Sequence, residues 1–449
     1  MPVFDRLKQE QPGALDKVRV MAGDLTLPNL GLSDDDQAAL VDEVSVVFHM
    51  GATVRFDEPL KRVVEINVLG TRAVLDLCRK MSKLCALVHL STAYFNWRQK
   101  EVHEMVYPSP VDTQKLIEAT RCINEKYLDT MGEFLVGQPN DYVMAKAVTE
   151  SLLLDERGTL PVAIVRPSIV TASWKEPFPG WVDNFNGCTG IIASVGMGLL
   201  PSVMGRKSCT ADLIPVDVAA NVLICVAWQI ATTRPSYLRV YNCTGTVFQR
   251  HNWGEVKNEV QRVVLQYPLP NAIFFPCFAV NSTQLLHYLV LFILRYLPAY
   301  IGDLALLSVK RQPRLVAQYR KVRKSLDALQ FYTTNTWVFR TGNLVGLVND
   351  LPPTDKQLFT IDVRKMDWHL YWDQYILGVR RHLFRADDTE LPQARKRLRW
   401  LHAMRWLMNF ALAAVLFRLV TTSAGWEVCC TVCTYVLGLC ELPCLKWPL

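Results

Sequence analysis

Unbroken apolar runs alternate with longer segments of helical periodicity along the first 165 residues of the chain. The runs lie at 17–24, 44–49, 84–90 and 162–165, and the longest helical segment lies at 59–80 with its apolar positions on one side. Strands that are apolar throughout are typical of a sheet covered on both faces, and alternation with helices is typical of parallel connections. The pattern therefore predicts an α/β fold with a doubly wound parallel sheet.

Polar residues mark the ends of further elements. Ser33 precedes three aspartates, and because acidic groups suit the first turn of a helix, a helix is predicted to run to about residue 42. Segments 112–131 and 142–155 are also predicted to be helical. Segment 187–207 is rich in glycine and is predicted to be a loop over the site.

Small and polar residues follow the predicted strands. In a doubly wound sheet the ligand lies off the carboxyl ends of the strands, so these residues would share one rim. Taken singly, each is an unremarkable loop residue, but together they indicate a ligand site. The candidates at the four strand ends are Asp24; Gly51 and Ala52; Ser91 and Thr92; and Pro167 to Val170, which includes Ile169.

The helix at 142–155 carries the candidate chemistry. Tyr142 and Lys146 are four residues apart, which places both side chains on one face of a helix, one turn apart. A free tyrosine has a pKa of about 10, and a nearby ammonium favours the phenolate and lowers that pKa. The pair is thus predicted to exchange protons with a carbonyl or an alcohol. An ordinary surface helix remains the alternative for this motif alone.

Composition narrows the class of protein. The 449 residues are 50% hydrophobic and 20% charged, which is typical of a globular protein with some membrane contact. A net charge of +7 is too small to indicate a nucleic-acid partner. Eight of the 13 cysteines are scattered in apolar settings, which favours reduced thiols over disulfides. The other five crowd the last 21 residues without a histidine among them, so no metal is expected. The charged N-terminus shows no secretory signal.

Several segments occur in the order typical of one enzyme family. They are GDLTLPNLGLSDDD, VVFHMGATVRFDEPL, INVLGTRAVLDL, VHLSTAYFN, DYVMAKAVTE, IVRPSIVTASWKEPFPGWVDNFNGCTG and ADLIPVDVAANVLI. Over roughly residues 1–405 the chain is thus similar to the fatty acyl-CoA reductases, which are extended short-chain dehydrogenases with a male-sterility C-terminal domain. The resemblance implies a Rossmann-type fold, a mainly helical C-terminal domain and a role in lipid metabolism.

The resemblance also implies a reaction and a role for each site residue. A long-chain acyl-CoA would be reduced to a primary alcohol with two NADPH, releasing CoA. Tyr142 would donate the proton, Lys146 would lower its pKa and hold the nicotinamide ribose, and Ser91 or Thr92, with Ser91 favoured, would bind the carbonyl oxygen. The implied cofactor contacts are Asp24 and Leu25 beside the adenine, Gly51 and Ala52 beside the cofactor backbone, Asn67 tying the rim, and Pro167, Ile169 and Val170 at the nicotinamide.

The sequence departs from the family at its beginning. No Gly-rich loop of the Thr-Gly-x-x-Gly-x-x-Gly kind occurs near the N-terminus, so the first strand, the phosphate loop and the second strand are expected to be missing, as in a truncated isoform. The sheet would then expose a strand edge, and NADPH would bind weakly or not at all. A catalytically inactive acyl-CoA or lipid-binding protein is therefore an alternative. A steroid or sugar-nucleotide enzyme is a weaker one.

Aromatic residues mark the second half. Spacings of three and four favour core packing for the aromatic positions of segment 362–381. A second group lines either an acyl channel or a loop anchor: Trp174, Phe178, Trp181 and Phe185. Three cations could meet CoA phosphates, although solvated surface is the commoner role for each: Lys175, Arg206 and Lys207.

The predicted organisation has four parts. A Rossmann-type domain at 1–270 precedes an apolar and basic connector at 271–330, a C-terminal domain at 331–405 and a membrane segment at 406–440. The apolar run 285–294 is too short to span a bilayer and predicts an interfacial or core helix. Basic residues before 406 predict that the catalytic domain faces the cytosol. The expected membrane is that of the endoplasmic reticulum or the peroxisome. The oligomeric state is not predicted.

Overall fold

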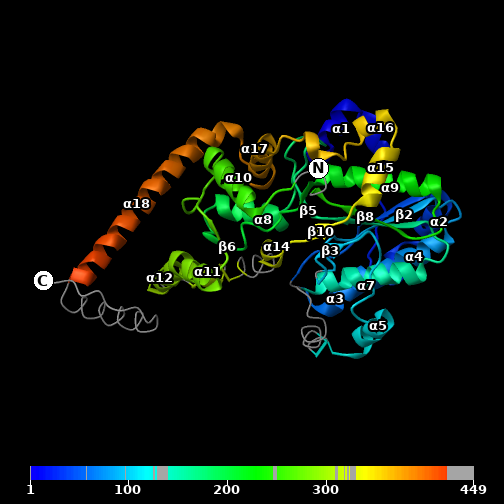
Figure 1. Cartoon of the computed structure of the whole chain (residues 1–449), viewed down its shortest axis with the longest axis horizontal. Coiled ribbons are helices and arrows are strands. Elements are labelled where there is room, and N and C mark those ends of the chain that lie inside the picture. Colours follow the sequence, from blue (N-terminus) through cyan, green and yellow to red (C-terminus); the bar gives the residue numbers. More distant parts are fainter. Residues whose placement is uncertain are drawn as a thin grey trace.

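A computed structural model describes most of the chain. Its described residues are 2–56, 58–96, 98–124, 127–128, 140–245, 250–308, 312–317, 319–320, 323 and 330–421. They form an elongated molecule with a four-stranded sheet at one end and long helices at the other (Figure 1).

The four-stranded sheet is parallel throughout, which confirms the predicted fold class. Its order is β1 (Val46–His49), β2 (Ala86–Leu90), β4 (Val162–Pro167) and β8 (Arg239–Cys243). Since all four strands run the same way, their carboxyl ends form a single rim.

Helices cover both faces of this sheet. Leu87 and Ile164 pack with residues of α4 (Gly70–Lys80) and α7 (Asp141–Glu156), whereas Val88 packs with residues of α9 (Val216–Thr233). Figure 1 shows the sheet lying between α9 on one side and α4 and α7 on the other. Neighbouring strand residues thus point to opposite cores, as the unbroken apolar runs predicted.

The predicted strand at 17–24 is wrong. This segment has no strand hydrogen bonds and begins in a 3-10 helix, η2 (Pro12–Lys17), and Val20 is 90% exposed. The outermost strand of the sheet is β1, whose Val46 and Phe48 remain exposed. A strand needs a ladder partner to satisfy its backbone groups, and segment 17–24 has none among the described residues. The predicted exposed edge is confirmed.

The other N-terminal helices follow the sequence signals. The Ser33 hydroxyl caps α2 (Asp34–Glu43) by accepting the N–H of Asp36. The predicted helix at 59–80 is continuous, but it contains a π turn at η4 (Glu65–Leu69) between α3 (Leu60–Val64) and α4. Helix α5 (Thr113–Cys122) ends earlier than predicted.

The predicted loop at 187–207 is also wrong, because it contains α8 (Gly187–Gly196). Gly187 begins that helix with a φ of +54°, and Cys188, Ile192 and Val195 are buried in the core. The apolar spacing within the glycine-rich stretch outweighs the helix-breaking tendency of its glycines.

Beyond α8, β6 (Ser202–Met204) pairs with β9 (Ala279–Asn281), and β5 (Ile169–Thr171) pairs with β7 (Leu213–Pro215). Helix α10 (Trp253–Gln266) packs against α8. These elements extend the molecule away from the four-stranded sheet (Figure 1).

The aromatic residues of α17 (Trp368–Gly378) are core residues, as predicted. Tyr371 donates a hydrogen bond to the carbonyl oxygen of Ala172 at 2.8 Å, and Tyr375 lies 2.7 Å from the hydroxyl of Thr189. At Gly378 the helix crosses Gly180 so closely that an added Cβ would lie 1.7 Å from its carbonyl oxygen. These contacts fix the C-terminal helices to the segment that follows β4.

The apolar run at 285–294 belongs to a longer helix than predicted. Helix α11 (Gln284–Leu291), a π turn η6 (Phe292–Tyr296) and α12 (Leu297–Ser308) form one rod of 25 residues. By length and composition alone, this rod and helix α9 are each long and apolar enough to cross a membrane. Because half of α9 is buried against the sheet, α9 is a core helix.

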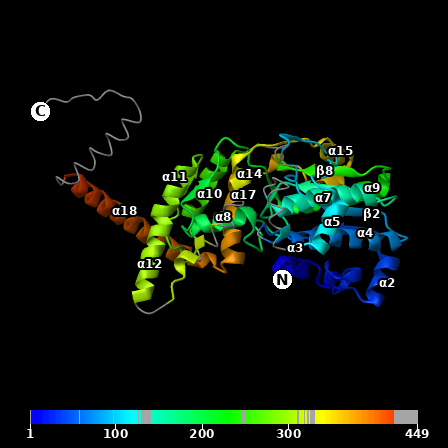
Figure 2. The same ribbon diagram turned by 90° about the horizontal axis from the view of Figure 1, so that it is seen from below.

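The last described element is α18 (Leu391–Thr421). It covers the start of the predicted membrane segment at 406–440, and the remainder of that segment lies outside the described residues. Figure 2 shows α18 and the rod of α11 and α12 at the end of the molecule away from the sheet.

Candidate active site

Helix α7 places Tyr142 and Lys146 at the rim of the sheet. The helix begins there because the side chain of Asn140 accepts the N–H of Val143 at 2.9 Å. Lys146 is 4% exposed, and its Nζ donates to the carbonyl oxygen of Leu90, the last residue of β2, at 2.7 Å. The same Nζ lies 6.0 Å from the centre of the Tyr142 ring.

Burial decides the protonation of this pair. It lowers the pKa of Lys146 to about 8, while the nearby Glu150 raises it. It also raises the pKa of Tyr142 above its ordinary value, with a smaller contribution from Tyr332. The expectation that Lys146 lowers the pKa of Tyr142 is therefore not met, because loss of water from the phenolate raises that pKa. At neutral pH Tyr142 holds its proton, as a proton donor must.

A buried ion pair stands behind this helix face. Glu150 and Arg166 are fully buried, and two guanidinium nitrogens of Arg166 donate to the Glu150 carboxylate. The other nitrogen of Arg166 donates to the carbonyl oxygen of His103 at 3.0 Å, and its carbon lies 4.1 Å from the centre of the Phe95 ring. The sequence analysis missed Glu150, although it lies one turn beyond Lys146 on the same face.

This ion pair also engages Ser91. The Ser91 hydroxyl is buried and donates to the Glu150 carboxylate at 2.5 Å, and its backbone N–H donates to the carbonyl oxygen of Val165. Thr92 is buried next to it, and its hydroxyl lies 3.4 Å from the N–H of Tyr94. The Ser91 hydroxyl is thus occupied by a carboxylate, whereas that of Thr92 makes only a long contact among the described residues.

Two of the predicted cofactor contacts meet at the edge of the sheet. An added Cβ at Gly51, just after β1, would lie 2.9 Å from the Leu25 side chain, and one at Gly70 would lie 3.0 Å from Leu25. Asp24 accepts from the N–H and the hydroxyl of Thr26, both at 2.8 Å, and these bonds lower its pKa. The 24–25 turn therefore reaches the rim although the predicted strand before it does not form.

Asn67 ties the rim together, as predicted. Its side chain exchanges two hydrogen bonds with the backbone of Thr53, just after Ala52, at 2.9 and 3.2 Å. Its carbonyl oxygen accepts from Thr71 and from Thr149 of α7. Asn67 lies in the π turn, which directs this carbonyl away from the helical ladder.

The third part of the rim follows β4. The carbonyl oxygen of Pro167 accepts the N–H of Ala93 at 3.0 Å, which joins this segment to the 91–92 turn. Ile169 begins β5 and is half-buried, and Val170 is exposed. Every predicted rim segment is thus in contact with a neighbouring one.

Aromatic residues missed by the sequence analysis enclose Tyr142. The centre of its ring lies 5.7 Å from that of Phe56, which lies 6.3 Å from that of Tyr332. Tyr332 packs edge-on against Tyr94 at 4.9 Å. Tyr332 reaches this group through Phe56 and is 190 positions from Tyr142 along the chain, so no local pattern could have indicated the arrangement.

Two buried histidines lie close to Lys146. His49 and His89 are paired in register on β1 and β2, with ring centres 5.1 Å apart. Burial lowers the pKa of His49 to about 4 and that of His89 well below its ordinary value, with Lys146 contributing to both. Both rings are neutral at neutral pH. Within the described part of the chain, no group of three His, Cys, Asp or Glu residues could hold a metal ion.

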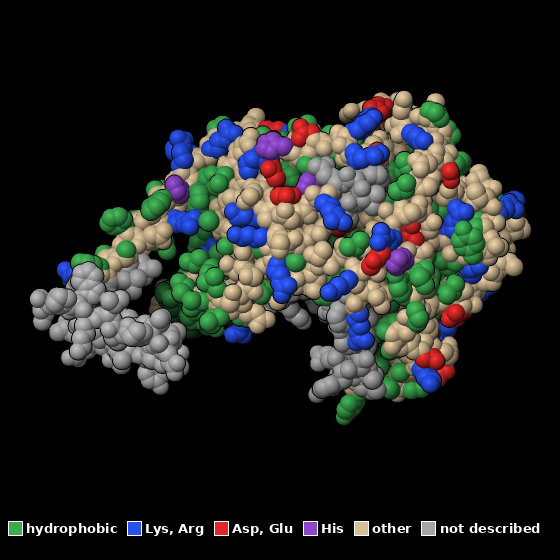
Figure 3. Space-filling view, viewed as in Figure 1, with side chains coloured by type: hydrophobic (Ala, Val, Ile, Leu, Met, Phe, Trp, Pro, Cys, Tyr) green, Lys and Arg blue, Asp and Glu red, His purple; other side chains and the backbone are tan. Residues whose placement is uncertain are grey.

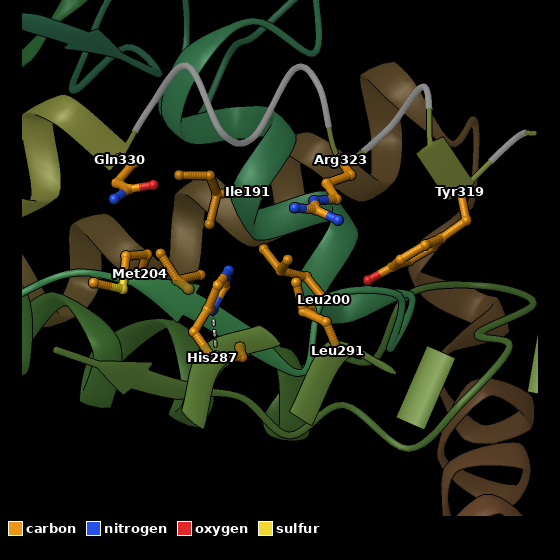
Figure 4. Close-up of a pocket in the computed structure, with 10 residues that line it drawn as sticks. Ile191, Leu200, Met204, His287, Leu291, Tyr319, Arg323 and Gln330 are labelled. Atoms are coloured by element: carbon orange, nitrogen blue, oxygen red, sulfur yellow. Dashed lines mark hydrogen bonds between the residues drawn. The ribbon is translucent and has the colours of Figure 1, made fainter. Parts of the chain in front are cut away.

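Two partly open cavities lie beyond the rim. They share Ile191 and Val203, so they adjoin each other. Figure 4 shows the first, which is lined by Ile191, Leu200, Ser202, Val203, Met204, His287, Leu291, Tyr319, Arg323 and Gln330. The second is almost entirely apolar and is lined by Cys188, Ile191, Ile192, Val203, Trp253, Val256, Lys257, Val260, Phe278, Val280 and Thr333.

The loop that carries Trp174, Phe178, Trp181 and Phe185 lines neither cavity. Its Phe178 and Phe185 contact His382 and Phe384 instead, at 5.2 and 5.7 Å between ring centres. Its backbone is held by Asp217, which accepts the N–H groups of residues 174–176. These contacts are those of a loop anchor, which was the alternative to an acyl channel.

Family profiles match most of the chain. Two profiles, both described as "Male sterility protein", match residues 1–223 and 294–386, and the first is an NAD-binding profile. "Fatty acyl-CoA reductase 1" of Xenopus laevis is 37% identical over 98% of this chain and 85% of its own length. The chain belongs to the fatty acyl-CoA reductase family.

Other comparisons agree with this family. The human "Fatty acyl-CoA reductase 1" is 36% identical over the same shares, and "Fatty acyl-CoA reductase 2" of Bos taurus is 33% identical over 98% of this chain and 85% of its own length. The terminal R domain from a myxalamid biosynthetic pathway has a TM-score of 0.50 and 18% identity, covering 81% of this chain and 75% of that one, and shares the fold alone. This member of the family is a Rossmann-type oxidoreductase whose cofactor is a nicotinamide nucleotide.

Proposed function

We propose that this chain reduces long-chain fatty acyl-CoA to a primary fatty alcohol with two NADPH and releases CoA. One observation carries the proposal. The Tyr142–Lys146 face of α7 reaches the end of β2, where the Lys146 ammonium binds the Leu90 carbonyl. Leu90 directly precedes the 91–92 turn, which supports placing Tyr142 as proton donor to a carbonyl bound at that turn.

NADPH would lie along the rim. What supports this is that Met50, Val54 and Val170 expose apolar surface for its rings, and that Gly51 and Ala52 are small enough for it to approach the backbone. Asp24 and Leu25 would hold the adenine, and Asn67 would keep the 51–53 turn in place. Lys146 would hold the ribose, and Pro167, Ile169 and Val170 would hold the nicotinamide. The cofactor would supply the hydride.

The protein's own part is to bind oxygen and move a proton. We infer that Thr92, rather than Ser91, hydrogen-bonds the substrate carbonyl, because the Ser91 hydroxyl already donates to Glu150. Tyr142 would then give its proton to the oxygen on which negative charge develops. Lys146, cationic below about pH 8, would stabilise the phenolate that forms.

The two adjoining cavities would take the hydrocarbon chain. Apolar side chains form most of their walls, as a site for a hydrocarbon chain requires. The short helix α14 (Gln330–Thr334) connects them to the site, since Tyr332 faces the Tyr142 enclosure, Thr333 lines one cavity and Gln330 lines the other. An acyl chain lying here would leave its thioester near Tyr142.

A membrane would take up the fatty alcohol product and anchor the enzyme. The second half of α18 exposes Trp406, Leu407 and Phe410, and a basic stretch precedes them. We propose that residues 406–440 anchor the chain in the endoplasmic reticulum or peroxisome membrane, with the catalytic domain in the cytosol.

The direct test is product formation. Purified chain is incubated with NADPH and a C16 acyl-CoA, and fatty alcohol and NADPH consumption are measured. Alcohol at one molecule per two NADPH supports the proposal. Thr92→Ala is expected to lower kcat about 100-fold or more, and Ser91→Ala far less, because a donor to the developing oxyanion contributes a factor of that order. A larger loss for Ser91→Ala would reverse the assignment.

A second candidate rests on the N-terminal segment. No Gly-x-Gly-x-x-Gly pattern precedes β1, and β1 is an exposed edge. The corresponding alternative is an inactive acyl-CoA or lipid-binding protein. Titration with NADPH and with acyl-CoA separates the two, because acyl-CoA binding without NADPH binding or alcohol formation fits only the second candidate.

A further inference from the structure

The rod formed by α11, η6 and α12 is unusually exposed for its composition. Leu285 is 78% exposed and Leu304 is 68% exposed, and a row of other large apolar side chains shares this face. They include Leu289, Phe292, Ile301 and Leu307. Figure 3 shows hydrophobic side chains gathered over α11 and α12. Soluble proteins rarely leave so continuous an apolar surface in water.

The histidine and the two charged residues of the rod point into the protein. His287 is 5% exposed, and its Nδ1 lies 2.8 Å from the Ser202 hydroxyl. The Arg295 guanidinium donates to the carbonyl oxygens of Gly198 and Leu199 and lies 4.3 Å from the centre of the Phe274 ring.

Asp303 is likewise turned inward. It is 8% exposed, and its carboxylate accepts the N–H groups of Arg314, Leu315 and Val316 at 2.9 to 3.0 Å. Arg295 and Asp303 are the only charged residues of the rod, so its outward face carries no charge. This arrangement is the reverse of an ordinary surface helix, in which charged residues face water.

Positive charge lies next to this face. Helix α18 has no acidic residue, and its first half exposes Arg395, Lys396, Arg397, Arg399 and Arg405. The segment at 272–275 joins the two helices, because Arg397 donates to the carbonyl oxygen of Ala272 and Arg405 lies 5.5 Å from the Phe275 ring. An uncharged apolar face beside a basic helix matches the surface of an anionic lipid leaflet.

The cavity in Figure 4 lies directly under this face. His287 and Leu291 of α11 form one of its walls, and Ile191 of α8 forms another. A hydrocarbon chain leaving a leaflet beside α11 would meet an apolar cavity on the protein side of the helix.

We propose that α11, η6 and α12 lie in the plane of one lipid leaflet, with the apolar face in the hydrocarbon and the basic part of α18 at the headgroups. The rod does not span the bilayer, since its inner face is bonded to β6 and to segments 198–199 and 314–316. This surface is separate from the C-terminal anchor. It rests on the proposal that the chain works at a membrane, but not on reductase activity.

Photolabelling of the full chain tests the proposal. Vesicles of phosphatidylcholine and phosphatidylserine contain a phospholipid with a diazirine in its acyl chain, and adducts are mapped by peptide mass spectrometry. We expect adducts within 284–308, at Leu285, Leu289 and Leu304. The matched internal control is Ile224 and Trp228 of α9, which are also exposed and apolar but should stay unlabelled. Labelling should fall when phosphatidylserine is omitted.

Two double variants show whether a lipid leaflet or another partner covers the apolar face of the rod. Leu289→Glu with Leu304→Glu should lower labelling of 284–308 roughly tenfold, because binding follows buried apolar area. Ile224→Glu with Trp228→Glu should leave it unchanged. Adducts confined to the C-terminal segment would overturn the proposal. So would a dimer in solution that the Leu289 and Leu304 variant dissociates, since a second copy would then cover the face. A chain that labels at 284–308 but forms no alcohol supports this surface and contradicts the proposed reductase function.

Discussion

Helix α7 and the rod of α11 and α12 both turn charged side chains towards the protein interior, but they use them differently. On α7, Lys146 and Glu150 lie beside ionisable or polar side chains, namely Tyr142, Arg166 and Ser91. On the rod, Arg295 and Asp303 are bonded to backbone carbonyl and N–H groups. The first arrangement places groups that can exchange a proton within reach of one another. The second removes charge from the outer face of a helix.

The difference shows how to interpret a buried charge. A backbone hydrogen bond alone does not decide the role, because Lys146 also donates to a backbone carbonyl, that of Leu90. What distinguishes Lys146 is that it lies beside Tyr142 and Glu150 and that burial lowers its pKa to about 8, close to neutrality.

The largest expected effect is on the rate of alcohol formation when Tyr142 of α7 is changed. Tyr142→Phe removes the proposed proton donor and should lower alcohol formation by about a thousandfold, within the range for general acid catalysis. Because the phenol sits in a largely apolar enclosure, folding should be unaffected. Thermal unfolding and single-turnover assays measure the two effects, with Tyr237→Phe, an exposed tyrosine, as control. Normal turnover by Tyr142→Phe would remove the proposed mechanism.

The next largest effect is on stability. Glu150→Gln leaves the Arg166 charge buried without its partner, which should cost about 3–5 kcal/mol in the free energy of unfolding. The matched control is Glu156→Gln on the same helix, because the Glu156–Arg72 pair is partly exposed and should contribute about 0–1 kcal/mol. Urea unfolding measures both. Similar costs for the two variants would show that the buried Glu150–Arg166 pair contributes no more to stability than the partly exposed Glu156–Arg72 pair.

Much of α7 and the sheet could be predicted from the sequence. The parallel strands follow from apolar runs, and the rim follows from the rule that parallel strands share one ligand edge. The role of Ser91 could not be predicted, because its partner Glu150 is 59 positions away. The strand at 17–24 was predicted from local composition, but a strand also requires a neighbour that no local pattern supplies.

The rod was harder to predict for a different reason. Arg295 interrupts the apolar run, so the sequence indicated that the helix ends or stays short there. The structure shows the helix continuing, because the guanidinium finds the Gly198 and Leu199 carbonyls on the inner side. Whether a charge ends an apolar helix depends on where its side chain points, and that is decided by residues distant in sequence.

A smaller effect is expected in the pH dependence. The pKa of Lys146 is lowered to about 8, so the ammonium is present below that pH and is lost above it. If the cation stabilises the phenolate of Tyr142, kcat/KM should fall by up to tenfold per pH unit above about 8. Lys146→Arg should move this fall in kcat/KM to higher pH, since a guanidinium keeps its proton. If the fall stays at the same pH in Lys146→Arg, it reports the titration of another group.

The smallest expected effect is on the rod in the absence of lipid. Leu304→Glu should change the free energy of unfolding by less than about 0.5 kcal/mol, because its side chain is already in water and makes no core contact to lose. The same change at Leu152 of α7, which is 1% exposed, would bury an unpaired carboxylate and should prevent folding. Urea unfolding without vesicles compares the two. A cost of about 2 kcal/mol or more at Leu304 would mean that its face is covered within the protein or by a second copy, and the contrast between the two helices would then fail.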